Sequence, residues 1–375
     1  MLHFGPSCLK RHVQQIAWAS QFASRRSSWQ RHSSTQAKPS KRKGPALAVA
    51  VLGTGIVAAY FLWPDTSRSA PTYSNAALSP SHFTPVTVTA SEQCADPNTR
   101  LLTLILSPNL LPPLHGSIFA PVWSIFIKDD DIQVERPYTP LEGIDESGRM
   151  KLWIKRYPKG EVGRWLHSKS VGDTIEIRGP LKTWTWLDDT WDEVIMISGG
   201  TGITPFYQLL HTVLLAPSKE AQPLSSTPLS LTRFTLLHSS RVPGELPPPE
   251  LLRPLIDHAE THPEQLRVSF FVDNKDGSSA QSIPNDNIRQ GRIDKADIGL
   301  ILGDRSAGLT WWQKLLRVST SKPEPVAGRK ILFLVCGPEP MIHAIAGPYG
   351  RNYSQGEVGG ILGQLGCTST QVWKL

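Results

Sequence analysis

Beyond residue 80, the pattern of apolar and polar positions divides the chain into two parts of different character. In residues 81–190, short apolar runs alternate with turns rich in Pro, Gly and Asp. Regularly spaced runs of this kind predict the strands of an antiparallel β-barrel. The predicted strands cover residues 83–90, 100–107, 123–128, 132–135, 151–157 and 174–178.

In residues 191–375 the apolar runs are continuous, and segments with helical periodicity lie between them. Continuous runs are typical of strands buried on both faces, and their alternation with helices favours a parallel sheet. We therefore predict an α/β domain with a parallel sheet. Its predicted strands are 193–198, 234–238, 268–272 and 331–335, its predicted helices are 205–215, 250–261 and 311–318, and its expected loops or insertions are the Pro- and Ser-rich stretches 216–232 and 319–328.

Residues 46–63 form an uncharged and mostly apolar run ahead of both domains. As a helix this run would span about 27 Å, close to the ~30 Å hydrocarbon core of a bilayer. We expect a single transmembrane helix here and a linker at 64–80, with a buried core helix as the alternative. The basic residues Lys41, Arg42 and Lys43 precede the run. The positive-inside rule therefore predicts that the rest of the chain lies across the membrane from them.

The net charge of +7 comes from the N-terminal residues and not from the predicted domains. Residues 1–45 contain nine basic residues and no acidic ones, and the remainder is close to neutral. The charge therefore gives no reason to expect nucleic-acid binding. Residues 1–34 are rich in Arg and Ser, which is typical of a mitochondrial transit peptide, with a disordered basic tail as the alternative. We expect the mitochondrial inner membrane, with the C-terminal domains in the intermembrane space.

The four cysteines exclude several classes of site. Cys8, Cys94, Cys336 and Cys367 lie far apart, and none belongs to a CxxC pair. This spacing excludes a zinc ribbon, covalently attached haem c and a disulfide-stapled scaffold. We expect no metal site, and we find no arrangement of His, Asp and Ser that indicates nucleophilic catalysis.

A glycine-rich segment follows the predicted strand at 193–198. Gly199, Gly200 and Gly202 surround Thr201, and Pro205 would lie in the first turn of a helix. Glycines permit a tight turn and a close approach of the backbone to a phosphate group. The spacing matches neither GxGxxG nor a P-loop, so by itself it leaves an ordinary turn open.

A second candidate site is the tetrad Arg136-Pro137-Tyr138-Thr139, at the end of a predicted strand. A guanidinium group can clamp a diphosphate through paired hydrogen bonds. A tyrosine ring can lie against a flat ring system, and a threonine hydroxyl can meet a ring nitrogen. In isolation the tetrad is also compatible with an exposed strand end.

The order of the motifs is more specific than each motif alone. The tetrad is followed by the glycine-rich segment, then by Cys336-Gly337-Pro338 and Met341. This order resembles the ferredoxin-NADP reductase-like superfamily and, within it, the NADH-cytochrome b5 reductase branch. The resemblance covers about residues 81–375 and implies an FAD-binding domain at 81–190 and an NAD(P)-binding domain at 191–375. With its N-terminal features, the chain is most similar to fungal inner-membrane flavoproteins that assist haem attachment to cytochrome c.

The resemblance implies roles for residues on the flavin side. Arg136 would pair with the FAD diphosphate, Tyr138 would stack on the flavin, and Thr139 would hydrogen-bond near flavin N5. The other residues that it implies around FAD are Ile154, Lys155, Tyr157, Gly160, Val162 and Gly163. At position 163 the family has a serine that helps to hold the diphosphate, so we expect the glycine to weaken FAD binding by about 1 kcal/mol.

On the nucleotide side, the resemblance implies two loops around the nicotinamide nucleotide, with Cys336 beside the nicotinamide. The residues of these loops are Gly199, Gly200, Thr201, Gly202 and Thr204, then Cys336, Gly337, Pro338 and Met341. The family also has a terminal aromatic residue that shields the flavin. This sequence has Leu375 at its final position and Trp373 two residues earlier, so we assign the shielding role to neither.

The choice between NADH and NADPH stays open in the sequence. Arg241 follows the predicted strand at 234–238, where the adenosine ribose lies in this fold, and it could accept a 2′-phosphate. The NADH-cytochrome b5 reductase branch, in contrast, favours NADH.

The resemblance implies that NAD(P)H gives two electrons to the flavin, which returns them singly to haem or a haem protein. Thr139 and Cys336 are the implied catalytic residues. We expect a membrane-anchored FAD oxidoreductase that supports cytochrome c haem attachment in mitochondria. The alternatives are a general NADH-cytochrome b5 reductase and a non-catalytic assembly factor on a reductase fold.

Overall fold

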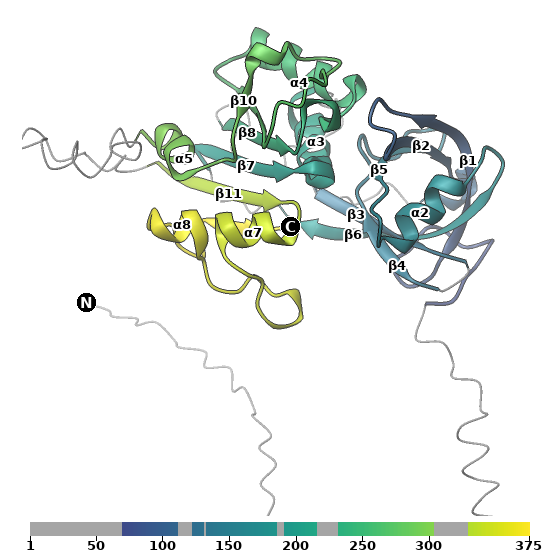
Figure 1. Cartoon of the computed structure of the whole chain (residues 1–375). Helices are drawn as coiled ribbons and strands as arrows, with labels where there is room; N and C mark the ends of the chain where they lie inside the picture. The colour runs from purple at the N-terminus through teal and green to yellow at the C-terminus, as the bar shows by residue number, and fades with distance from the viewer. Residues whose placement is uncertain (1–69, 112–121, 131–132, 186–190, 216–231, 304–328) are drawn as a thin grey trace, which may run out of the picture. The chain divides into compact units, whose positions relative to one another are not determined.

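The computed structural model describes residues 70–111, 122–130, 133–185, 191–215, 232–303 and 329–375 (Figure 1). The predicted transit peptide at 1–34, transmembrane helix at 46–63 and helix at 311–318 lie outside these ranges. In the ranges that are described, no helix has the length and apolar character that crossing a bilayer requires.

The first sheet is antiparallel throughout, and its strand order is β4-β3-β6-β1-β2-β5. Apolar side chains alternate along its strands and fill one core, which is why short alternating runs predicted these strands. Helix α2 (Glu161–Ser168) adds Val162 and Leu166 to that core. The strands are β1 (Thr84–Gln93), β2 (Thr99–Ile105), β3 (Val122–Lys128), β4 (Glu135–Tyr138), β5 (Arg149–Lys155) and β6 (Thr174–Trp184).

The second sheet is parallel throughout, and its order is β10-β9-β8-β7-β11-β12. Every residue of the central strand β7 is buried, because helices cover both faces of the sheet. Its strands are β7 (Glu193–Gly199), β8 (Arg233–Ser240), β9 (Leu266–Val272), β10 (Ile288–Gln290), β11 (Ile331–Cys336) and β12 (Val372–Lys374).

The two faces of β7 pack against different helices. Val194 and Met196 share a core with residues of α3 (Thr204–Leu210) and α4 (Pro249–Thr261). Ile195 and Ile197 share the opposite core with residues of the remaining α-helices described. Those helices are α5 (Lys295–Ile301), α7 (Glu339–Ala346) and α8 (Gly360–Gln364); single-turn 3₁₀ segments lie at Pro108–Leu110, Gly200–Ile203, Pro243–Glu245, Asn285–Asn287 and Arg351–Tyr353, and a π-helix lies at His211–Leu215.

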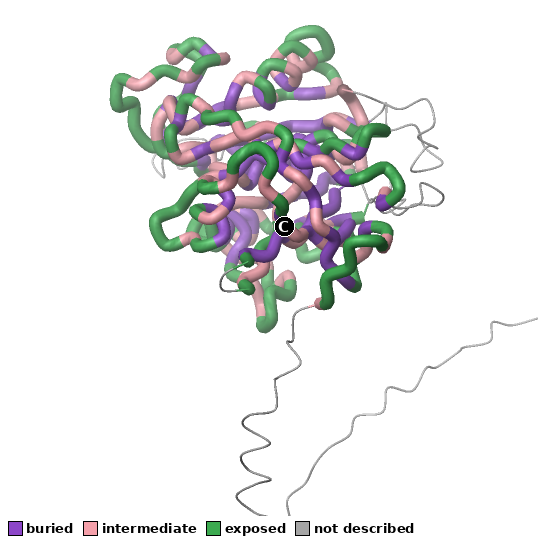
Figure 2. The backbone as a smooth tube through the Cα atoms, turned by 90° about the vertical axis from the view of Figure 1, so that its right-hand side faces the viewer, coloured by how far each residue is buried: buried purple, intermediate pink, exposed green. Residues whose placement is uncertain are grey.

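The domains that contain the two sheets pack together through an apolar core. The core on the α3 side of the parallel sheet also contains Val122, Leu141, Trp153 and Trp184 from the antiparallel-sheet domain. Figure 2 shows the buried segments gathered in the interior and the exposed ones around it. The packing places the carboxyl ends of the parallel strands β7 and β11 beside residues of the antiparallel-sheet domain.

The predicted fold class is confirmed in its two main parts, an antiparallel sheet followed by a parallel one. Among the described residues, β4 and β5 are the sheet edges and are not hydrogen-bonded to each other, so the predicted barrel is open there. The strand predicted at 132–135 instead begins at Glu135 and runs through Tyr138. Pro137 within it has no N–H to donate, which an edge strand tolerates.

Two helical segments also differ from the prediction. The helix predicted at 205–215 is α3 followed by the π-helix, because the backbone hydrogen-bonding pattern changes at His211. Helix α2 is absent from the prediction, since the sequence pattern drew attention to its glycines and not to its apolar face. Both differences bear on the site, because α2 and α3 border it.

Candidate functional site

A cleft of about 620 Å³ lies where the two domains meet. The antiparallel sheet lines it with residues of both edge strands, β4 and β5, and of the start of α2. The parallel sheet lines it with the loops that follow β7 and β11. Ligands of open parallel sheets bind outside the carboxyl ends of their strands, so this is the expected place for a nucleotide.

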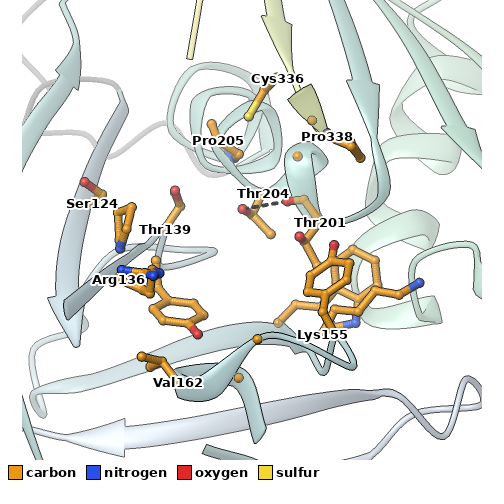
Figure 3. A pocket seen from close by; sticks show the side chains of 18 of the residues that line it. Ser124, Arg136, Thr139, Lys155, Val162, Thr201, Thr204, Pro205, Cys336 and Pro338 are labelled. Atoms are coloured by element: carbon orange, nitrogen blue, oxygen red, sulfur yellow. Dashed lines mark hydrogen bonds between the residues drawn. The ribbon is translucent and has the colours of Figure 1, made fainter. Parts of the chain in front are cut away.

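Most of the predicted site residues line this cleft. They are Arg136, Tyr138, Thr139, Lys155, Tyr157, Gly160, Val162, Gly163, Gly199, Thr201, Gly202, Thr204, Cys336, Gly337 and Pro338. Figure 3 shows Arg136 and Thr139 on one side of the cleft, with Thr204 and Cys336 on the other. Residues separated by some 200 positions in the sequence thus meet in one site.

Four predicted residues do not line the cleft: Ile154, Gly200, Arg241 and Met341. Ile154 is buried in the core of the antiparallel sheet. Gly200 has a φ of +54°, a left-handed conformation that glycine adopts readily, and it forms part of the turn after β7. The Met341 side chain packs beneath Gly199, where a Cβ atom would meet its sulfur.

Arg136 presents its guanidinium group to the cleft. Its Nη1 donates to the carbonyl oxygen of Glu135 at 2.9 Å, while the Glu135 carboxylate accepts from Arg178 at 2.7 and 3.0 Å. The neighbouring acid is therefore held by another arginine, and Arg136 keeps donors for an anion. Burial raises the pKa of the Tyr138 hydroxyl, so its ring stays neutral and can lie against a flat apolar surface.

Gly163 forms a close approach of α2 to strand β5. A Cβ atom on Gly163 would lie 2.9 Å from the carbonyl oxygen of Lys155, closer than real Cβ contacts. A serine at this position would therefore push the helix away from the strand. Gly163 thus fits the close packing of α2 against β5, and it lines the cleft.

The two loops of the parallel sheet also touch through their backbones. A Cβ atom on Gly202 would lie well inside contact distance of the Cys336 carbonyl oxygen and of the Gly337 Cα. The hydroxyl of Thr204 donates to the Thr201 carbonyl at 3.0 Å, which closes the turn (Figure 3). Small residues are required here because there is no room between the loops for a side chain.

Cys336 ends strand β11 at the cleft and is partly buried. Burial raises the pKa of its thiol to about 12. The group is therefore a neutral thiol at physiological pH, since a thiolate needs a pH near its pKa. It can make contacts and fill space beside a ligand.

A charged network lies beside the cleft and connects the two domains. The ammonium group of Lys155 lies 2.9 Å from Glu245 Oε2 and 3.4 Å from Asp96 Oδ2. Glu245 also accepts from Arg241, at 2.6 Å to Nη2 and 3.1 Å to Nε. Arg241 is thus paired with a carboxylate at the surface, where its side chain is 71% exposed.

Sequence reasoning missed some lining residues. Ser124, Trp153, Thr183 and Leu375 all face the cleft. Strand alternation could have suggested the first three, since they lie in strands. No local sequence pattern marks Leu375 as a site residue, because only the fold brings it to the cleft.

The segment around Leu375 is held by several hydrogen bonds. Its N–H donates to Val335 O at 2.9 Å, and the Tyr349 hydroxyl donates to its carbonyl oxygen at 2.8 Å. Lys374 exchanges backbone hydrogen bonds with the Gln355 side chain at 2.7 and 2.8 Å. Leu375 therefore lines the cleft, at the place left unassigned by sequence, while Trp373 is exposed and does not line it.

Two further observations concern His238 and possible metal ligands. His238 is fully buried, Ser198 lies 2.8 Å from its Nδ1, and burial beside Lys155 lowers its pKa to about 3, so it is a neutral core residue. Within the described ranges, no group of three or more His, Cys, Asp or Glu side chains could hold a metal ion.

Comparison with known proteins agrees with this geometry. Residues 117–186 match a family model described as an oxidoreductase FAD-binding domain. The chain is 30% identical over 250 residues to NADH-cytochrome b5 reductase 2-A of Vanderwaltozyma polyspora, covering 66% of this chain and 70% of that protein. It is 30% identical over 251 residues to NADH-cytochrome b5 reductase 2 of Meyerozyma guilliermondii, with coverage of 66% and 70%.

A solved structure supports the fold. The cytochrome b5 reductase domain of Ulva prolifera nitrate reductase superposes with a TM-score of 0.52 at 20% identity. The match covers 80% of this chain and 100% of that domain. With the sequence relatives and the cleft, it leads to one assignment: the chain belongs to the NADH-cytochrome b5 reductase branch of the ferredoxin-NADP reductase-like superfamily.

Proposed function

We propose that this NADH-dependent FAD oxidoreductase passes electrons to haem or a haem protein in the mitochondrial intermembrane space, and so supports haem attachment to cytochrome c. The observation that carries the redox part is the cleft that unites the 136–139 tetrad with the loops after β7 and β11. The observation that carries the location is the basic, acid-free N-terminus followed by an uncharged apolar run.

The residues of the cleft fit FAD. Arg136 has donors available for a diphosphate, and the backbone of α2 approaches the same region, where a Cβ at Gly163 would meet the Lys155 carbonyl. Tyr138 and Val162 offer apolar surface to a flat ring, and Thr139 offers a hydroxyl on the same wall. When bound, FAD supplies the conversion between two-electron exchange with a nicotinamide and one-electron exchange with a haem.

The protein's contribution to the reaction is position and exclusion of water. Thr139 on the flavin side and Thr204 and Cys336 on the nucleotide side face one another across the cleft (Figure 3). The reaction requires no general base. A neutral Cys336 thiol suits this arrangement, because it adds no charge beside a nicotinamide whose charge changes on oxidation.

The charged network favours NADH over NADPH. Glu245 occupies the guanidinium of Arg241, the residue that could otherwise accept a 2′-phosphate. The carboxylate would also repel the additional phosphate. This agrees with the relatives, which are named for NADH.

The relatives' names favour a second candidate acceptor, cytochrome b5. Both candidates require the same flavin and nucleotide sites, so they differ only in the partner. Two departures from the family pattern, Gly163 and the missing terminal aromatic, would favour a non-catalytic factor. Gly163 permits the close packing of α2, and Leu375 lines the cleft, so neither is a sign of a degraded site.

Purified full-length protein in detergent tests the redox function. We expect a flavin spectrum that bleaches with NADH and recovers when haem is added under anaerobic conditions. Recovery with cytochrome b5 but not with haem or cytochrome c assembly proteins would favour the second candidate. A colourless protein that does not respond to added FAD would exclude both.

Protease treatment of mitochondria with ruptured outer membranes tests the location. We expect digestion of the C-terminal domains, because Lys41, Arg42 and Lys43 would remain on the matrix side. Survival of these domains until detergent is added would place them in the matrix and contradict a role in cytochrome c haem attachment.

A further inference from the structure

One buried side-chain amide connects the two domains directly beside the cleft. Gln208 belongs to α3 of the parallel-sheet domain and is 2% exposed. Its Oε1 accepts from the backbone N–H of Trp123 at 2.8 Å, and its Nε2 donates to the carbonyl oxygen of Pro140 at 2.8 Å. Both partners belong to the antiparallel-sheet domain.

Each end of this connection lies next to a residue that lines the cleft. Trp123 precedes Ser124, and Pro140 follows Thr139. Gln208 itself lies about one helical turn after Thr204, which also lines the cleft. Figure 3 shows Ser124, Thr139 and Thr204 at the cleft, so the amide joins the backbone segments that carry all three.

The surroundings of Gln208 explain why such a connection matters. The interface around it is an apolar core that includes Val122, Leu141 and Phe206. Apolar packing alone tolerates small shifts, whereas a buried amide is satisfied in only one arrangement of its partners. The pairing of β3 with β6 also shifts its register between Val122 and Trp123, where the N–H of Trp123 is directed to Gln208.

We propose that Gln208 is a positioning residue that fixes the register between the two walls of the cleft. The inference rests on the proposed function. It adds that electron transfer from the nicotinamide depends on Gln208, a residue outside the cleft. Reaction rates across such a site are sensitive to displacements of about 1 Å, so loss of the connection should affect rate more than binding.

Three variants separate this role from a general loss of packing. Gln208→Met keeps the length and apolar bulk of the side chain but removes both hydrogen bonds. Gln208→Glu keeps an acceptor for Trp123 and, when ionised, lacks the donor to Pro140. Thr212→Val is the matched control, because its hydroxyl donates at 2.9 Å to the Gln208 backbone oxygen within the same segment and connects nothing across the interface.

The experiment measures flavin reduction of the full-length protein by NADH in a stopped-flow instrument, together with amide hydrogen exchange. For Gln208→Met we expect unchanged FAD content, a KM for NADH within about threefold, and a reduction rate lowered about tenfold or more. We also expect a larger isotope effect with deuterated NADH and faster exchange at the Trp123 amide. Thr212→Val should change neither rate nor exchange at that amide.

The outcomes distinguish the proposed function from the positioning role of Gln208. A Gln208→Met rate within about twofold of wild type, with unchanged exchange at Trp123, would overturn the positioning role. If Gln208→Met does not fold, the same comparison is made with Gln208→Glu, for which we expect a smaller loss of rate. If NADH fails to reduce the wild-type flavin, the proposed function is wrong, and unchanged Trp123 exchange in the variants would separately overturn the role of Gln208.

Discussion

The two walls of the cleft are built from different parts of the polypeptide. The antiparallel wall presents side chains, among them Arg136 and Tyr138 from an edge strand and Thr139 directly after it. The parallel wall also presents side chains, among them Thr204 and Cys336, but Gly199, Gly202 and Gly337 lie where its loops approach too closely for a Cβ atom. An edge strand displays alternate side chains, whereas the carboxyl ends of parallel strands lead into tight turns.

This difference indicates how each wall can be damaged. The antiparallel wall should lose function when a side chain is removed. The parallel wall should lose function when one is added. The following predictions test the contrast, from the largest expected effect to the smallest.

Gly202→Ala should have the largest effect. The added methyl group would collide with the backbone of Cys336 and separate the two nucleotide loops. We expect a destabilisation of about 1–3 kcal/mol and at least a ~100-fold loss in kcat/KM for NADH, measured by urea unfolding and steady-state kinetics. Gly172→Ala adds a methyl group in open space outside the cleft but at a φ of +96°, so it should lose stability through backbone strain and keep its kinetics. Normal turnover in Gly202→Ala would contradict the close packing of the loops.

Arg136→Ala should weaken FAD binding while leaving the fold intact. The change removes the guanidinium that faces the cleft, and a charge-assisted pair contributes about 1–3 kcal/mol, or roughly 5- to 150-fold in Kd. Fluorescence titration of the deflavinated protein with FAD measures it. Arg149→Ala, an exposed arginine paired with Asp145 in the same sheet, is the control. Unchanged FAD affinity would show that Arg136 is only a surface residue.

Glu245→Gln should relax the preference for NADH. Removing the negative charge frees Arg241 for a 2′-phosphate, so we expect the ratio of kcat/KM for NADPH to that for NADH to rise about tenfold. The double variant with Arg241→Ala should lose that gain. An unchanged ratio in Glu245→Gln would mean that the ribose lies away from this pair. Because Glu245 also pairs with Lys155, both variants should be checked for FAD content.

Cys336→Ser should have the smallest effect, a reduction in the rate of flavin bleaching of about threefold to tenfold. The thiol pKa is raised to about 12 by burial, so the group is protonated throughout the neutral range. We therefore expect the wild-type rate to show no inflection from thiol ionisation between about pH 6 and pH 9. A rate that rises through pH 8 and loses that rise in Cys336→Ser would mean that the thiolate takes part.

The sequence by itself determined the type of each domain and most of the cleft's residues. Alternating and continuous apolar runs predicted the two sheets, because residue periodicity is a local consequence of strand geometry. The tetrad at 136–139 and the glycines after β7 were also found locally. Glycine and arginine can be recognised as site residues from the sequence alone. The backbone freedom of glycine and the charge of arginine have few other uses at such positions.

The tertiary structure alone decided which residues act together. Arg241 and Glu245 are four residues apart, but nothing in the pattern shows that Lys155 from the other domain joins them. Leu375 lines the cleft only because strand β12 pairs with β11. Gln208 is an ordinary helix residue until its partners in the other domain are seen. In each case the deciding contact joins side chains or strands through folding geometry, which periodicity and motif spacing do not encode.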